Sequence, residues 1–390
     1  MKYLIIILLQ LFAYQLYAEE FPIVAYYGIP HKYATFSRYN DMREAGFNIS
    51  IDHYTNAKDA IKCLSMAENA GIKLIMSGNC MKGESVENFV AQVCTKKALY
   101  GYCLADEPRM SDYSELSALK KRIIGIDKNA HPCYLNLFPN YDDVLLKHIG
   151  VEDYEQYLLK YSKLKTPQLS FDFYPFTKRG ERKRWMQTLM AVKKVSTNVG
   201  RPFWGFILIT PHSVYPQQSY SQLLLQAYTN LAFGAQGLEY FTYWTPPTYG
   251  PNDFHDAPID IDGNKTDNYR LVKKLNKQIY PYLRFFKDAE VERIGCLGKI
   301  PEGMEKMEVL PYGIKNLKMY DASSALLSVM SKRGNRYLVI VNRDVSNKMR
   351  LKFTYSNDNV KCIAQDGTSV KVKTEYTIEP GDMLMLNIVL

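Results

Sequence analysis

The chain has 390 residues, of which 47% are hydrophobic and 23% charged, and its formal net charge is +9 at pH 7. This length is too great for one ordinary hydrophobic core and predicts a large domain followed by a smaller one. The modest positive charge and the lack of a recognised binding motif argue against nucleic acid as a partner. The seven cysteines and six histidines have no metal-site spacing, so we expect neither a metal nor another cofactor.

The first residues have the pattern of a secretory signal peptide. Lys2 supplies a positive charge, residues 3–16 form an apolar run, and Ala18 ends a small-residue cleavage site. The apolar run is shorter than the roughly 18 residues of a membrane span, and no later stretch reaches that length. We therefore expect residues 1–18 to be removed and the mature protein to be exported to the periplasm or the extracellular medium, with no membrane-inserted segment.

From residue 21 onward, short apolar runs alternate with segments of helical period. This alternation predicts parallel strands, because a parallel crossover needs a dozen or more residues. Eight such units over about 265 residues are typical of a closed (β/α)8 barrel, a TIM barrel, which we place at residues 19–286. The expected strands are residues 23–29, 48–53, 73–77, 100–105, 133–138, 168–174, 203–210 and 238–244. The clearest helical segments are residues 57–70, 85–95, 113–124, 182–197, 216–233 and 269–279.

After residue 282 the pattern changes to short strands separated by turns, with no long helical segment between them. This pattern predicts a small antiparallel β-sandwich over residues 287–390. Its expected strands are residues 325–331, 337–342, 349–353, 370–374 and 383–389.

The active site of such a barrel lies at the C-terminal ends of its strands. The fourth expected strand runs directly into Asp106, Glu107 and Pro108. Two adjacent carboxylates repel each other and are costly to place. The structural alternative is an acidic first turn of the following helix, but the position at the barrel mouth favours a catalytic role.

The sixth expected strand carries a third acidic residue, Asp172. Strand alternation turns Asp172 and Tyr174 into the barrel, while Phe171 and Phe173 face the outer helices. Because the fourth and sixth strands are next-but-one neighbours, we expect Asp172 to lie near Glu107.

The eighth expected strand contains Glu239 and ends at Trp244. If Trp244 faces the mouth, alternation turns Tyr240 and Thr242 inward and Glu239 outward. Glu239 is then a partner for a helix cation rather than a nucleophile.

Polar and aromatic side chains at the other strand ends are candidates for substrate binding, with tyrosine and tryptophan as a platform for sugar rings. Asp52 and His53 either contact substrate hydroxyls or form an internal hydrogen-bonded pair. The basic run at residues 178–184 is either a solvated helix start or a subsite for a uronate or sulfate group. The candidate binding residues are Tyr27, Asp52, His53, Asn136, Asn140, Tyr174, His212 and Trp244.

Four segments resemble exported barrel proteins of gut Bacteroidetes that are similar to clan A glycoside hydrolases, in particular the family 42 β-galactosidases. The segments are residues 100–108 (YGYCLADEP), 132–140 (PCYLNLFPN), 169–176 (LSFDFYPF) and 227–246 (AYTNLAFGAQGLEYFTYWTP). The resemblance implies a retaining exo-glycosidase whose general acid/base on the fourth strand is Glu107. It also implies an asparagine before the acid/base and a glutamate nucleophile after the seventh strand. This chain instead has Asp106, and residues 203–210 end without a carboxylate.

The sequence thus predicts a glycoside hydrolase that cleaves an oligo- or polysaccharide, with Glu107 as general acid. Asp172 is the first choice for the second carboxylate, as nucleophile or as base for water, and Asp106 is the second choice. A carboxyl separation of about 5 Å would imply retention, and about 6.5–9.5 Å inversion. The alternative is a non-catalytic glycan-binding barrel, and a third reading is a scaffold. If no carboxylate lies within roughly 10 Å of Glu107 across an open pocket, binding is favoured over hydrolysis.

Overall fold

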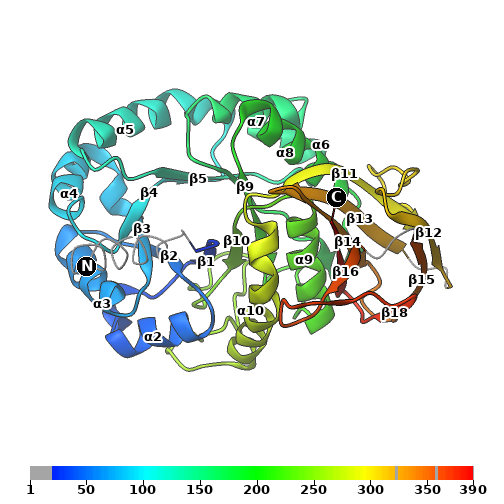
Figure 1. Ribbon diagram of the computed structural model, residues 1–390. Helices are drawn as coiled ribbons and strands as arrows, with labels where there is room; N and C mark the ends of the chain where they lie inside the picture. Colours follow the sequence, from blue (N-terminus) through cyan, green and yellow to red (C-terminus); the bar gives the residue numbers. More distant parts are fainter. Residues whose placement is uncertain (1–19, 321–323, 356–358, 390) are drawn as a thin grey trace, which may run out of the picture.

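The structure is a computed structural model that describes residues 20–320, 324–355 and 359–389, so the expected signal peptide lies outside the described residues. A closed barrel of eight parallel strands forms the N-terminal part, and antiparallel sheets form the C-terminal part (Figure 1). Both parts of the predicted fold class are confirmed.

The eight barrel strands follow one another around the barrel in chain order, and β10 closes the ring by pairing with β1 from Ile23–Leu238 to Tyr26–Phe241. The seventh strand around the barrel is β9, which coincides with the expected strand at residues 203–210. The number of strands deduced from the sequence is therefore right. The barrel strands are β1 (Ile23–Tyr26), β2 (Ile49–His53), β3 (Lys73–Ser77), β4 (Leu99–Asp106), β5 (Cys133–Leu137), β6 (Leu169–Phe171), β9 (Phe203–Leu208) and β10 (Leu238–Phe241).

Helices surround the barrel, and most of them begin at a residue whose side chain caps the free backbone N–H groups of the first turn. In α9, the Ser219 hydroxyl accepts from the Gln222 amide, and the Gln222 side chain accepts from the Ser219 amide. This capping box explains why the helix begins at Tyr220 rather than at the expected Pro216. The helices are α2 (Phe36–Glu44), α3 (Ala57–Asn69), α4 (Val86–Val93), α5 (Tyr113–Ile126), α6 (Asp143–Ile149), α7 (Tyr154–Ser162), α8 (Trp185–Val199), α9 (Tyr220–Ala232) and α10 (Asp267–Phe286). Short 3-10 turns are η1 (His31–Tyr33), η2 (Asn79–Met81), η3 (Gly83–Ser85) and η4 (Met110–Asp112). In the described ranges no helix is both long enough and apolar enough to cross a membrane.

The barrel interior is filled by side chains below its mouth, while a larger apolar core lies between the strands and the helices. The interior is therefore closed, and the C-terminal mouth is where groups from different strands can meet a substrate. The interior side chains include Val24, Tyr26, Ile49, Ile51, Ile75, Cys103, Tyr134, Trp204, Phe206 and Leu208.

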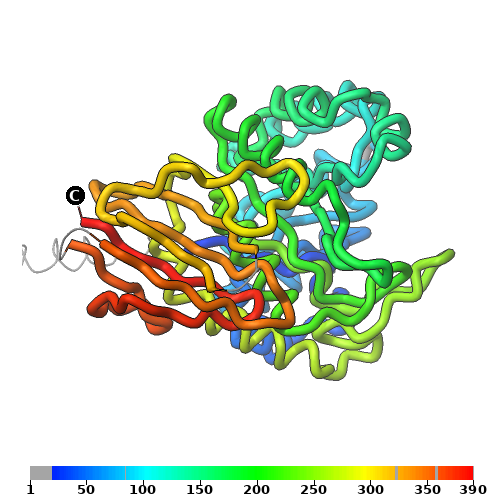
Figure 2. The backbone as a smooth tube through the Cα atoms, turned by 90° about the vertical axis from the view of Figure 1, so that its right-hand side faces the viewer, coloured from blue at the N-terminus to red at the C-terminus, as the bar shows by residue number. Residues whose placement is uncertain are grey.

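The C-terminal sheets lie against one side of the barrel, next to α9 (Figures 1 and 2). A six-stranded sheet consists of β11 (Glu290–Gly298), β13 (Ser324–Lys332), β14 (Asn335–Asn342), β19 (Met383–Val389), β16 (Val360–Ile363) and β17 (Ser369–Lys371). A three-stranded sheet consists of β12 (Ile314–Met319), β15 (Met349–Tyr355) and β18 (Glu375–Ile378). The strands β11, β12, β16 and β18 were not among those expected from the sequence. A small hairpin of β7 (Phe176–Thr177) and β8 (Gly180–Glu181) follows β6 in the barrel.

Candidate active site

The mouth of the barrel brings together three carboxylates from β4 and from the end of β6, joined by an asparagine of β5. Asn136 Nδ2 donates to Asp106 Oδ1 at 2.9 Å and to Asp172 Oδ1 at 3.3 Å. The carboxyl of Glu107 is in hydrogen-bond contact with that of Asp172. Four residues that the sequence singled out therefore form one connected group.

The backbone of β4 explains how two consecutive acids both reach the mouth. Consecutive residues of a regular strand point to opposite faces. The pairing of β4 with β5 shifts register between Cys103 and Ala105, and such a bulge re-aims the residues after it. Glu107 then adopts a φ of 49°, a region that costs free energy for a residue other than glycine. The Glu107 amide donates to the Asn136 carbonyl at 3.0 Å, which holds this conformation in place.

The pair formed by Glu107 and Asp172 retains a proton at neutral pH. Burial, the negative charges of Asp172 and Asp106, and the hydrogen bond to Asp172 raise the pKa of Glu107 to about 10. Burial and the charge of Asp106 raise the pKa of Asp172 to about 7. Two carboxyl groups in contact cannot both ionise without strong repulsion, so one of them remains an acid that can donate a proton.

Asp106 has a different environment from the other two carboxylates. Barrel atoms surround its carboxylate, yet Asp106 is the exposed residue of β4. Burial among those atoms raises its pKa, while hydrogen bonds from Asn136 and Tyr26 and the nearby His53 ring oppose that rise. Asp106 is thus an exposed acidic residue whose carboxylate accepts a hydrogen bond from Asn136.

Glu239 corrects one of the sequence-based predictions, because it points into the barrel rather than toward the outer helices. Its Oε2 atom accepts from Ser170 Oγ at 2.6 Å and from Tyr134 OH at 3.0 Å, and the side chain is buried. Ser170 Oγ also lies 3.2 Å from Asn136 Oδ1. Burial raises the pKa of Glu239 to about 8. Glu239 thus lies beneath the carboxylate group, linked to it through Ser170 and Asn136.

Trp244 does not form part of the mouth, contrary to the expectation of a sugar platform there. Its ring stacks on Tyr33 with centroids 5.0 Å apart, beside the Arg38 guanidinium, and it is buried. Regular pairing of β10 ends at Phe241, so alternation counted back from Trp244 crosses a break and gives the wrong face for Glu239.

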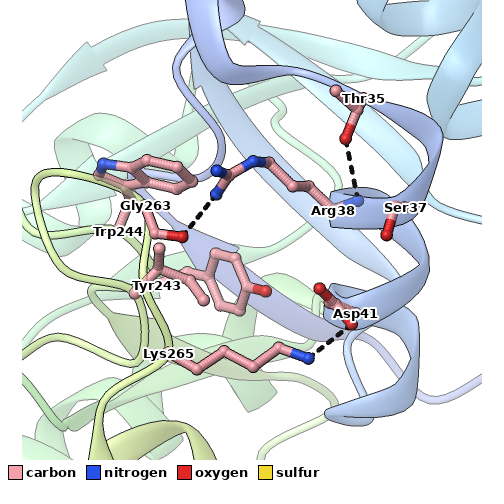
Figure 3. A pocket seen from close by; sticks show the side chains of 9 residues that line it. Thr35, Ser37, Arg38, Asp41, Tyr243, Trp244, Gly263 and Lys265 are labelled. Carbon is pink, nitrogen blue, oxygen red and sulfur yellow. Dashed lines mark hydrogen bonds and ion pairs between the residues drawn. The ribbon is translucent and has the colours of Figure 1, made fainter.

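Trp244 lies at the edge of a polar cavity of about 260 Å³ between α2 and the loop before α10 (Figure 3). Arg38 donates to the carbonyl of Gly263 at 2.7 Å, and Lys265 pairs with Asp41 at 2.6 Å. None of the three mouth carboxylates lines this cavity.

Asp52 is also separated from the mouth. It is buried and accepts hydrogen bonds from Ser50, Tyr39 and Tyr54. Burial raises its pKa to about 6. Asp52 is therefore internally satisfied, but its partners are not the expected His53, which is exposed.

The remaining expected binding residues lie around the rim. The Tyr27 ring packs against His53, with centroids 5.3 Å apart. His212 Nδ1 is bonded to the carbonyl of Thr210 at 2.9 Å. Asn140 accepts from Arg184, and Tyr174 is buried at the barrel interior, where burial and the charge of Asp172 raise its pKa.

Several neighbours of the carboxylates were missed by the sequence analysis. Tyr26 and Ser170 follow the inward alternation of β1 and β6, so strand period was sufficient to find them. Tyr141 and Tyr215 come from loops, whose shapes cannot be deduced from a residue pattern. In the described part of the chain, no three His, Cys, Asp or Glu residues are grouped so as to hold a metal ion.

No protein-family model matches the chain, and no curated protein matches it. Solved structures share its fold. A GH42 β-galactosidase from G. stearothermophilus, solved as a catalytic mutant, has a TM-score of 0.64 at 8% identity, over 95% of this chain and 98% of that one. A β-galactosidase from Bacillus circulans sp. alkalophilus has a TM-score of 0.62 at 9% identity, over 95% and 99% of the two chains. A family 39 glycoside hydrolase from Bacteroides cellulosilyticus WH2 has a TM-score of 0.55 at 10% identity, over 95% and 81%. The fold that the resemblance implied is thereby confirmed.

Proposed function

We propose that the protein is a glycoside hydrolase that cleaves glycosidic bonds of an oligo- or polysaccharide at the barrel mouth. The observation that carries the proposal is the Glu107–Asp172 carboxyl pair, which retains a proton, beside the exposed carboxylate of Asp106. Glycoside hydrolysis needs one protonated and one ionised carboxyl group, with pKa values set apart by their environments. The similar solved structures, two β-galactosidases and a family 39 glycoside hydrolase, support the same class of reaction.

In this proposal Glu107 donates its proton to the glycosidic oxygen as the bond to the anomeric carbon breaks. Asp172 keeps that proton on Glu107 until the substrate arrives. Because Asp172 shares a proton with Glu107, whereas Asp106 is exposed, we favour Asp106 over Asp172 as the second carboxylate. Asp106 then acts as nucleophile or as base for water. This order of the two aspartates differs from the one favoured by the sequence.

The test is a hydrolysis screen with three proteins: wild type, Glu107→Gln and the control Glu115→Gln. Glu115 is an exposed glutamate in the first turn of α5. Against a panel of aryl glycosides and polysaccharides, we expect wild type and Glu115→Gln to release sugar. Glu107→Gln should lose about 10²-fold or more in kcat/KM, the size of a general acid's contribution. Full activity of Glu107→Gln on a confirmed substrate would overturn the assignment.

A non-catalytic glycan-binding barrel is the second candidate, because β9 runs into Ile209, Thr210 and Pro211 without a carboxylate. The proton that the Glu107–Asp172 pair retains at neutral pH weighs against it. Shifts of the melting temperature with particular glycans, equal in wild type and Glu107→Gln and without sugar release from any substrate, would favour binding over hydrolysis.

A further inference from the structure

We propose that Arg182 binds an anionic substituent of the substrate, the carboxylate of a uronic acid or a sulfate ester, next to the Glu107–Asp172 pair. The proposal rests on the proposed function for the position of the sugar. Two observations carry the inference. The Arg182 side chain is held by two tyrosines, and the acidic residues around it are paired with other cations.

Arg182 is fixed to the part of the chain that carries Asp172. Its amide donates to the carbonyl of Pro175 at 2.8 Å, three residues after Asp172. Arg182 directly follows β8. The preceding residue, Glu181, forms an ion pair of 2.6 Å with the buried Arg343 of the C-terminal domain. The hairpin that presents Arg182 is therefore held from both sides.

Two tyrosine rings hold the guanidinium group. It lies 4.0 Å from the ring centroid of Tyr141 and 5.6 Å from that of Tyr215, and its Nη2 atom donates to the Tyr215 hydroxyl at 3.1 Å. The hydroxyls of Tyr141 and Tyr215 are hydrogen-bonded to each other at 3.1 Å. Stacking of this kind orients the planar group before a ligand binds, so little rotational freedom is lost on binding.

The same tyrosines place the guanidinium beside the reacting groups. The Tyr141 hydroxyl accepts from the amide of Tyr174, two residues after Asp172, at 3.2 Å. The negative charge of Asp172 acts on the pKa of both Tyr141 and Tyr215 and raises it. The guanidinium thus contacts two tyrosines that also lie within the electrostatic reach of Asp172.

Arg182 has no anionic partner of its own in the described part of the chain. The neighbouring acids are paired with other cations, Glu181 with Arg343 and Asp143 with Arg184. The Nε atom of Arg182 is buried without a hydrogen-bond partner among the described residues. A partly buried cation without a counter-ion is costly.

A carboxylate or sulfate group on the sugar would supply this missing anion. The guanidinium fork matches both groups with two parallel hydrogen bonds. A neutral hydroxymethyl group offers no charge, and so it would leave the cation uncompensated. Arg182 thereby selects an acidic sugar over its neutral counterpart.

Binding rather than hydrolysis tests the inference, in the Glu107→Gln background so that the measurement is independent of catalysis. NMR titration compares the dissociation constants of D-glucuronate, D-galacturonate and galactose 6-sulfate with those of glucose and galactose. The titrations are made on the protein with Arg182 intact and on its Arg182→Gln and Arg182→Lys variants. The control is Lys178→Gln, which removes the same charge from the same hairpin, where Lys178 is bonded to the carbonyl of Ser213.

We expect at least one anionic sugar to bind tenfold or more tightly than its neutral counterpart. Arg182→Gln should abolish this preference, Arg182→Lys should reduce it, and Lys178→Gln should change it less than threefold. Equal binding of anionic and neutral sugars, or equal weakening of both by Arg182→Gln, would overturn the inference and leave Arg182 as a brace for the tyrosines. Failure of the hydrolysis screen would contradict the proposed function alone, since sugar binding is measured independently.

Discussion

At the scale of single residues, the mouth separates the roles of three carboxyl groups by their surroundings. Glu107 and Asp172 share one proton, because each raises the cost of ionising the other, whereas Asp106 is exposed and accepts a hydrogen bond from Asn136. Enzymes place carboxyl groups in unlike environments to keep one protonated and another ionised at the same pH.

Asp172→Asn should move the alkaline limb of the pH–rate profile to lower pH. The charge of Asp172 is the second-largest cause, after burial, of the raised pKa of Glu107. Without that charge Glu107 loses its proton at lower pH, and activity falls with it. We expect a shift of about one pH unit or more in kcat/KM, since a neighbouring like charge shifts a pKa by one to three units. A limb that stays where it is in wild type would contradict the role given to Asp172.

The sequence was sufficient to identify the carboxylates but not their contact. Strand ends in a barrel locate Asp106, Glu107 and Asp172 at one mouth. Their contact depends on the bulge in β4 and on the positive φ of Glu107. Neither feature follows from residue periodicity, because both are imposed by pairing with β5.

At the scale of elements, the barrel strands were predictable because each is a short apolar run followed by a helical period. The residues at which the strands end were less predictable. The expected strand at residues 168–174 is regular only over β6, and Asp172 lies just beyond it. The same effect at the end of β10 produced the wrong face for Glu239. Hydrogen-bonded pairing stops where the chain turns to form the mouth, and alternation cannot be continued past that point.

Inside the barrel, Glu239 of β10 connects β5 and β6 through Tyr134 and Ser170. Its pKa is about 8 in the folded protein, against about 4.3 in an unfolded chain. As pH rises between these values, the unfolded state releases a proton that the folded state keeps, so this group's contribution to stability falls. Glu239→Gln has the shape of the protonated acid and does not titrate.

We therefore expect the melting temperature of Glu239→Gln to approach that of wild type at pH 5 and to exceed it by about 2 °C or more at pH 8. Calorimetry across this pH range measures the difference, with Glu115→Gln as the control for a surface glutamate. Parallel curves for wild type and Glu239→Gln would show that Glu239 does not bind a proton in the folded barrel.

At the scale of the whole molecule, the C-terminal sheets are fastened to the helical side of the barrel. Ser221 Oγ in α9 donates to the carbonyl of Val345 at 2.6 Å, and Gln278 in α10 donates to Asp382 at 3.1 Å. The ion pair between Arg343 and Glu181 extends this contact to the hairpin at the mouth. The sequence predicted a sandwich after the barrel, but not its position, because the docking contacts come from separate loops.

Gly381→Ala should disrupt this docking. Gly381 has a φ of 71°, and a Cβ atom there would lie 2.0 Å from the carbonyl oxygen of Ser221. Gly334 is a matched control, since its φ is 78° and a Cβ there has no neighbour within 4 Å. We expect Gly334→Ala to lower the free energy of unfolding by about 1 kcal/mol, the cost of the backbone conformation alone. Gly381→Ala should cost about 3 kcal/mol or more in denaturant unfolding, because overpacking adds to it. Equal losses would contradict close docking at this point.

The central claim, that Glu107 is the general acid, is tested most directly by the dependence of Glu107→Gln on the leaving group. Once the screen has identified a sugar, kcat/KM is measured for its 2,4-dinitrophenyl glycoside and for its methylumbelliferyl or natural glycoside. A dinitrophenolate leaves without protonation, so we predict that Glu107→Gln retains most of its activity on the first substrate. On the second it should lose about 10²–10⁴-fold. Equal losses on both substrates, or no loss on either, would contradict the account.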